Sequence, residues 1–209
     1  MDKTLPKRAT VYSVAAQIVY KLDQTLETSS GKAVLANLRN SIGKPLSESI
    51  SIWPLMFENL PEEFLSQGTS LSKKEIAILT ALQLYALYRQ GKKAAVSQGM
   101  KEQETKETRR NNIGYSLKAL RAGDHTTAMD RRFNALITAA TYEELIHHLR
   151  QMTNLLKAKS SGEAEIDFGK LAQDLYGFLI GKDESIRLNW ARAYYQRSYS
   201  KGEIENDQQ

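Results

Sequence analysis

Apolar residues recur at helical spacing along almost the whole chain, and this pattern limits the possible folds more than any other feature. Val11, Val14, Ile18 and Leu22 form one such series, and few segments alternate as strands do. Each series would place its apolar side chains on one face of a helix. We therefore predict an all-α protein whose helices pack these faces together.

Capping signals locate several of the expected helices. Ser72 followed by Glu75 forms a capping box and predicts a helix that runs to about Arg89. Thr141 followed by Glu144 predicts a second helix start in the same way.

The last expected helix begins near Asp183, whose side chain is expected to serve as its N-cap. Its inward face should carry Ile186, Trp190 and Tyr194 because these residues are four apart.

A polar, charged segment divides the chain. Residues 96–112 contain almost no large apolar side chain and are expected to form a linker or loop. We therefore predict two small helical bundles, residues 1–95 and 113–200, joined by this linker. Residues 201–209 are expected to be a disordered tail.

The composition excludes several classes of protein. The chain has no cysteine, so it has neither a disulfide nor a thiol nucleophile. No apolar run is long enough to span a bilayer, and the first residues show helical spacing in place of a secretory core. We expect a cytoplasmic protein that does not associate with membranes.

Catalytic and metal-binding motifs are missing. The sequence contains no HExxH, no GxxxxGK[ST] and no GxSxG. His147 and His148 are adjacent, so on a helix they point about 100° apart and do not suit one metal ion. We predict no enzymatic activity, no metal site and no cofactor.

Positive charge is concentrated in parts of the chain. Between Leu87 and Ala122 there are nine lysines or arginines against three glutamates, a larger excess than the net charge of +5 on the whole chain. Such clusters suit phosphate contacts, which are independent of base sequence and sensitive to salt. Because no zinc finger, basic zipper or RNP motif is present, we expect contacts with the nucleic-acid backbone and not with bases.

The stretch "DRRFNALITAATYEELIHHLR" adds three arginines to a pair of amphipathic helices. Arg131 falls opposite the apolar face of its helix, and Arg150 falls on the outer flank of the next helix. Arg132 lies to one side, where it could instead pair with Asp130 or Glu144.

Six tyrosines could stack on nucleobases, but their helical spacing favours core or core-edge positions. These residues are Tyr12, Tyr20, Tyr85, Tyr88, Tyr194 and Tyr195.

An ordered series of motifs resembles a known family. The series contains "LANLRNSIGKP", "WPLMFENLP", "ALQLYALYRQG", "NNIGYSLKALR", the arginine-containing stretch, "IDFGKLAQDLYGF" and "LNWARAYY". It resembles the CasB family, the small subunit of the type I-E CRISPR surveillance complex, Cascade. The likeness extends from about Val34 to Tyr195, and its order and spacing are more specific than any single motif.

The resemblance implies an all-helical, non-catalytic protein that works inside a larger complex. Members pair with a second copy and lie beside the backbone subunit and the large subunit. Their basic surface steadies the R-loop, which comprises the target strand paired with crRNA and the displaced strand. In such systems base pairing reads the sequence and protein holds the backbone.

The resemblance places the basic surface at matching positions of this chain. Asn40 stands where members often have a second arginine, so this position can donate a hydrogen bond but carries no charge. Together with Arg121 from the basic cluster, the candidate nucleic-acid-binding residues are Arg39, Lys44, Lys118, Arg121, Arg131, Arg132 and Arg150.

Two other interpretations remain open at this stage. A helical adaptor could use the same basic patches to dock an acidic protein. An enzyme could assemble its site from scattered residues that no motif reveals.

Overall fold

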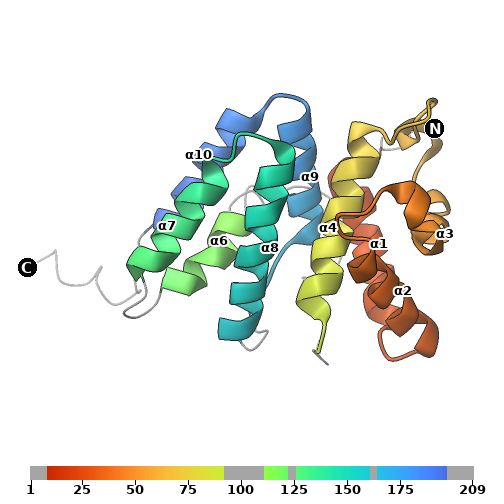
Figure 1. Cartoon of the computed structure of the whole chain (residues 1–209), viewed down its shortest axis with the longest axis horizontal. Helices are drawn as coiled ribbons and strands as arrows, with labels where there is room; N and C mark the ends of the chain where they lie inside the picture. Colours follow the sequence, from red (N-terminus) through yellow and green to blue (C-terminus); the bar gives the residue numbers. More distant parts are fainter. Residues whose placement is uncertain (1–8, 92–110, 122–125, 161–163, 197–209) are drawn as a thin grey trace, which may run out of the picture.

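The computed structural model describes residues 9–91, 111–121, 126–160 and 164–196, and these ranges contain helices, turns and loops but no strand (Figure 1). The prediction of an all-α protein is confirmed. The α-helices, in chain order, are α1 (Val11–Thr25), α2 (Ser29–Asn40), α3 (Trp53–Phe57), α4 (Lys73–Arg89), α6 (Ile113–Leu117), α7 (Thr126–Ile137), α8 (Tyr142–Lys159), α9 (Phe168–Leu179) and α10 (Asp183–Tyr195). The short 3₁₀ helices are η1 (Leu46–Glu48), η2 (Ile50–Ile52), η3 (Glu62–Phe64) and η4 (Lys118–Arg121).

The capping signals begin their helices as predicted. The Ser72 hydroxyl accepts a hydrogen bond from the Glu75 N–H at 3.1 Å, and the Glu75 carboxylate accepts one from the Ser72 N–H at 2.6 Å. The α4 helix that follows ends at Arg89. At the start of α8, the Thr141 hydroxyl accepts from the Glu144 N–H at 3.1 Å.

The expected N-cap of the last helix is wrong. Asp183 is the first residue of α10, the N-cap is Lys182, and no side chain caps the helix end. Gly181, at φ +80°, lies in the turn that closes α9, where the Lys182 N–H donates to the Gly177 carbonyl at 2.9 Å, and α10 begins directly after this turn. The Asp183 carboxylate lies 3.4 Å from Arg187, one turn further along α10. The inward face is confirmed, because Ile186, Trp190 and Tyr194 are all buried.

Helix α9 comes late in the chain but packs against two early helices, α1 and α4. Phe168 meets Tyr85 of α4 edge to face, with ring centroids 5.3 Å apart. A Cβ atom at Gly169 would lie 3.0 Å from the Tyr12 carbonyl oxygen, so glycine allows α9 to approach α1 closely. A helix from the second half of the chain therefore completes the core of the first half.

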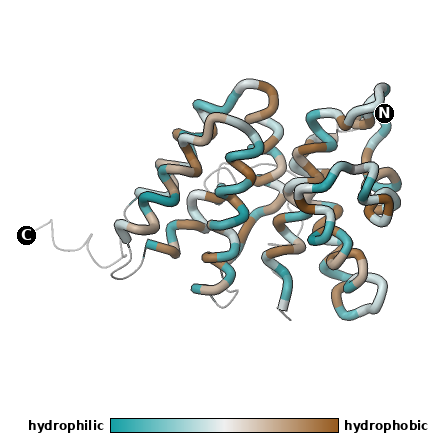
Figure 2. The backbone as a smooth tube through the Cα atoms, viewed as in Figure 1, coloured by the Kyte–Doolittle hydropathy of each residue, from teal (hydrophilic) through white to brown (hydrophobic). Residues whose placement is uncertain are grey.

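The buried apolar side chains of both halves belong to one connected core. In Figure 2, hydrophobic and hydrophilic residues alternate along most of the helices. The division into residues 1–95 and 113–200 stays a prediction, because most of the expected linker lies outside the described residues. The expected tail at 201–209 lies outside them as well.

Helix α10 packs against α6, α7 and η4, and the last two of these carry four of the candidate basic residues. A Cβ atom at Gly114 of α6 would lie 2.1 Å from the Trp190 carbonyl oxygen, so these two backbones are in close contact. On α7, the Phe133 ring stacks on Tyr194 with centroids 3.7 Å apart. Helix α8 packs beside α7, and η4 contacts both.

The preference for core positions is confirmed for four of the six tyrosines: Tyr12, Tyr85, Tyr88 and Tyr194 are each no more than 3% exposed. Tyr20 and Tyr195 are 41% and 39% exposed.

Candidate nucleic-acid interface

The two arginines of α7 project from the side of the helix that faces away from the core. Phe133 and Leu136 are fully buried, whereas Arg131 and Arg132 are exposed. Helical geometry explains the separation, because the arginines fall outside the arc that the apolar residues occupy. Neither arginine forms an ion pair with another described residue.

The two acids considered as partners of Arg132 have other partners. Asp130 pairs with Arg121. The Glu144 carboxylate lies 3.7 Å from His148 and accepts a hydrogen bond from the Ala140 N–H at 2.7 Å. The alternative pairing of Arg132 is therefore not seen.

Arg121, unlike Arg131 and Arg132, is paired with a carboxylate. Its guanidinium donates to both carboxylate oxygens of Asp130, at 2.9 and 3.2 Å, and lies 5.4 Å from the Tyr194 ring and 5.0 Å from the Tyr195 ring. The hydrogen bond from Arg121 holds the pKa of Asp130 below its usual value, against the opposing effect of burial. Arg121 therefore ties η4 to α7, and a phosphate contact from this residue stays a prediction.

Arg39, near the end of α2, lies against the C-terminal end of α4, and Lys157 of α8 lies against the same end. Arg39 donates to the Ala86 carbonyl at 3.4 Å, and Lys157 of α8 donates to the Leu87 carbonyl at 3.3 Å. Burial lowers the pKa of Lys157, and the positive charge of Arg39 lowers it further. The unpaired carbonyls and the helix dipole of α4 attract both cations to this end.

A cavity of about 370 Å³ opens beside Arg39. It is lined partly by Lys32 and by Arg89, which is 3% exposed and lies 3.6 Å from the carboxylate of Asp23. The charge of Arg89 is therefore buried in the core. Lys32 and the half-buried Arg39 reach the surface here, and Lys32 pairs with Glu27 at 3.6 Å.

Of the three remaining candidates, Arg150 is half-buried on α8, and the other two lie in a turn and at the start of a 3₁₀ helix. Lys44 is exposed in the turn after α2, where Gly43 adopts a φ of +77°. Lys118 is half-buried at the start of η4.

The described residues offer no metal site and no membrane span. Nowhere in these ranges do three His, Asp or Glu side chains gather closely enough to hold a metal ion. His147 contacts Gln151, with their nitrogens 2.9 Å apart, and His148 contacts Glu144. No described helix is long and apolar enough to cross a membrane.

One family of known proteins matches most of the chain. The model of the family described as CRISPR-associated protein Cse2 matches residues 34–195. The chain belongs to the Cse2 family. The resemblance to CasB proteins, predicted over the same range from the motifs, is confirmed.

Two solved structures of Cse2-family proteins share this fold. CasB from Thermobifida fusca is 24% identical, with a TM-score of 0.67 over 88% of this chain and 97% of that one. The Cse2-family CRISPR-associated protein from Thermus thermophilus is 22% identical, with a TM-score of 0.60 over 88% of this chain and 99% of that one. No curated protein matches the chain in sequence.

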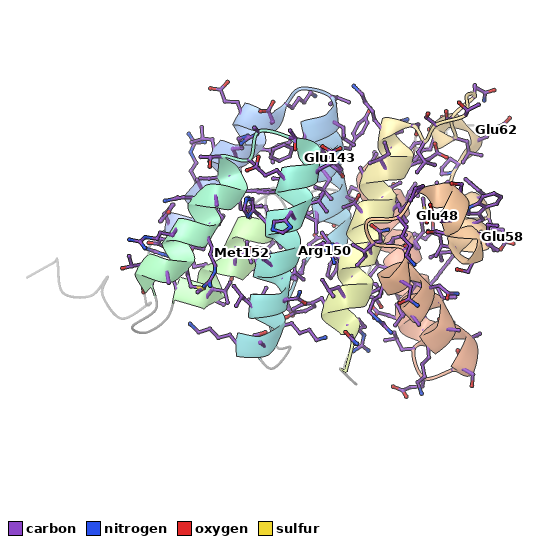
Figure 3. All side chains as sticks on the ribbon, in the orientation of Figure 1. Glu48, Glu58, Glu62, Glu143, Arg150 and Met152 are labelled. Atoms are coloured by element: carbon purple, nitrogen blue, oxygen red, sulfur yellow. The ribbon has the colours of Figure 1, made fainter. Side chains whose placement is uncertain are left out.

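In this Cse2-family chain, one basic residue of interest was missed by the sequence analysis. Lys157 follows Arg150 by seven residues, close to two turns at about 3.6 residues per turn, so both lie on one face of α8 (Figure 3 labels Arg150). That spacing was visible in the sequence. The proximity of Lys157 to Arg39 was not, because the two residues are far apart in the chain.

We call Arg39, Lys157 and Arg150 the basic strip. It runs from the end of α2, past the end of α4, and along α8. The α7 pair, Arg131 and Arg132, stands on the helix packed beside α8. The structure thus brings cations from distant parts of the sequence onto neighbouring helices.

Proposed function

We propose that this Cse2-family protein is a non-catalytic small subunit of the type I-E CRISPR complex, Cascade, and that its basic surface holds nucleic-acid backbone in the R-loop. Its partners would be the backbone subunit, the large subunit and a second copy of itself. Its ligands would be the target and displaced DNA strands and the crRNA–DNA duplex. No enzymatic step is assigned to it.

The observation that carries this proposal is the difference between two kinds of cation. Arg89 and Arg121 pair with carboxylates and hold helices together. In contrast, Arg131, Arg132 and Arg150 form no ion pair within the described ranges, although folded helices hold them in place. Arg131 and Arg132 are exposed and Arg150 is half-buried, and because all three lack acidic partners they are free to neutralise phosphate.

The charges suit backbone binding better than base reading. Each phosphate that a cation neutralises releases counterions, so affinity falls with salt and is indifferent to sequence. In RNA-guided recognition the guide supplies the sequence information. A subunit that binds backbone phosphates therefore stabilises R-loops independently of their sequence.

The test is a titration of the full chain with single- and double-stranded DNA of several sequences over a salt series. The triple variant R131A/R132A/R150A should bind more weakly on every sequence, and its log–log salt slope should be shallower by up to about 2 to 3. The matched control, K21A/K73A/K182A, removes the same charge from exposed lysines outside the basic strip and the α7 pair and should retain affinity.

A loss confined to one DNA sequence, or an equal loss in the control, would contradict the proposal. If the isolated chain binds no DNA, the same variants in reconstituted Cascade decide the matter through the lifetime of the R-loop. An unchanged lifetime would favour the adaptor interpretation, in which basic patches dock an acidic protein.

A further inference from the structure

The segment formed by η2 and α3 is apolar on both of its faces. Its inner face is buried: Ile52 and Met56 are each 1% exposed. On the outer face, Ile50 is 63% exposed, Trp53 is 37% exposed and Phe57 is 41% exposed. A helix at the edge of a protein normally turns polar residues to water, so this outer face is unusual.

The three outer residues form one patch. They are three and four residues apart, which places them on the same side of the helical segment. The Trp53 and Phe57 rings meet edge to face with centroids 6.1 Å apart. Figure 2 shows hydrophobic colour around α3 at the edge of the molecule.

The charged residues of the segment that carries this patch are all acidic, although Lys21 of α1 donates to Asn59 at 2.7 Å. Between Lys44 and Lys73 the sequence has no lysine, arginine or histidine, although the whole chain carries a net charge of +5. The acids in this interval are all exposed: Glu48, Glu58, Glu62 and Glu63. In Figure 3 the labelled Glu48 and Glu58 lie beside α3 and Glu62 lies above it, all at the edge of the molecule away from Arg150 on α8.

We propose that this α3 face, made of Ile50, Trp53 and Phe57 and rimmed by glutamates, docks a different protein subunit whose surface is apolar at its centre and lined with lysine or arginine. Aromatic residues at the centre of a polar rim are typical of protein interfaces. The acidic rim adds complementarity to a cationic partner and fixes its orientation. The inference rests on the proposed membership of Cascade, which supplies the partner subunits.

Charge argues against two other occupants. Nucleic acid would be repelled, because its phosphates would meet the glutamates. A second copy would have to present its own cations to the glutamates. Those cations include Arg131, Arg132 and Arg150, which the proposed function assigns to phosphate. A subunit of another kind leaves the nucleic-acid surface available.

The experiment measures binding of the full chain to the remaining Cascade subunits, assembled with guide RNA but without this chain. I50S/F57S should weaken binding at least tenfold. E58K/E62K should also weaken binding at low salt, with a smaller loss at high salt because screening removes the repulsion. The matched controls are Y115S/L188S, two exposed apolar residues on α6 and α10, and E143K/E184K, two exposed acids elsewhere; both should bind like wild type.

A photo-cross-linking amino acid, p-benzoylphenylalanine, in place of Phe57 identifies the occupant. A cross-link to an apolar, cation-bordered site on another subunit supports the proposal. A cross-link only to a second copy or to nucleic acid overturns it, as does wild-type binding by I50S/F57S.

The outcome is separable from that of the nucleic-acid proposal. I50S/F57S should keep the wild-type DNA affinity and salt slope, whereas R131A/R132A/R150A should join the complex normally and shorten the R-loop lifetime. If the wild-type chain does not join the subunits at all, Cascade membership and the α3 proposal both fail, while DNA binding by the isolated chain is judged on its own titration.

Discussion

Replacing Asp130 with asparagine should destabilise the protein without weakening its binding to DNA. The Asp130 carboxylate accepts from Arg121 at 2.9 and 3.2 Å and from the Tyr194 hydroxyl at 3.0 Å. Asparagine keeps the shape of the side chain and one acceptor oxygen but removes the negative charge. Arg121 then keeps its charge and loses its partner, so the tie between η4 and α7 weakens.

The size of the effect follows from the exposure of the pair. The Arg121 and Asp130 side chains are 29% and 25% exposed, which places them between surface and interior. Surface ion pairs contribute about 0 to 1 kcal/mol and hydrogen bonds to charged groups about 1.5 to 3 kcal/mol, so we expect a loss of about 1.5 kcal/mol. For a chain of this size, that loss lowers the unfolding midpoint by roughly 3 to 6 °C.

The difference between Asp130→Asn and wild type should also depend on pH. The hydrogen bond from Arg121 lowers the pKa of Asp130 in the folded protein. A carboxyl group of this kind stabilises fully above its pKa in the unfolded chain, about 3.9, and the stabilisation disappears as the pH falls through the folded pKa. The gap in unfolding midpoint should therefore be constant from neutral pH to about pH 5 and shrink below about pH 4.

Thermal unfolding followed by circular dichroism measures the gap, with Glu143→Gln as a control that neutralises an exposed carboxylate on α8. An unchanged midpoint for Asp130→Asn at neutral pH would refute the structural role of the pair. In a companion titration, Arg121→Met should lower the midpoint similarly and leave the salt slope of DNA binding unchanged. A slope reduced by about one would instead support the phosphate contact predicted for Arg121.

Three further substitutions test other parts of the structure. Lys157→Met should make the salt slope of DNA binding shallower by about 0.7 to 0.9. An unchanged slope in the DNA titration would mean that Lys157 does not contact phosphate. Gly114→Ala would place a Cβ atom 2.1 Å from the Trp190 carbonyl oxygen, so we expect a loss of about 1 to 3 kcal/mol in urea unfolding through overpacking; wild-type stability would mean that α6 and α10 are further apart. Glu75→Ala removes the acceptor of the 2.6 Å hydrogen bond from the Ser72 N–H at the start of α4, so we expect a loss of about 1 to 2 kcal/mol in the same assay. No loss would show that the capping box does not stabilise the helix.

Much of the fold was predictable from local patterns. Helical spacing and the Ser72–Glu75 capping box depend on residues within one or two turns of each other, so the sequence displays them directly. Asp183 is not the N-cap as expected, because α10 begins directly after the turn at Gly181 that closes α9, with Lys182 at the N-cap position.

The candidate site was predictable only in part. The sequence identified the exposed Arg131 and Arg132 on α7 and the half-buried Arg150 on α8, because their positions relative to the apolar face follow from helical geometry. It did not show that Arg121 is paired, since the acid that pairs with it is chosen by packing. It also passed over Lys157, whose approach to Arg39 depends on how α8 and α2 meet at the end of α4.

The sequence by itself determined that the chain is helical, which faces of its helices are buried and which family motifs it carries. Only the tertiary structure decided which cations are engaged with carboxylates, which are gathered on neighbouring helices, and that an aromatic, acid-rimmed face stands at α3. The physical reason is the distance along the chain over which each kind of interaction acts. Helical periodicity and capping act over a few residues, whereas pairing and exposure depend on contacts such as that of Arg89 with Asp23, between residues that folding alone brings together.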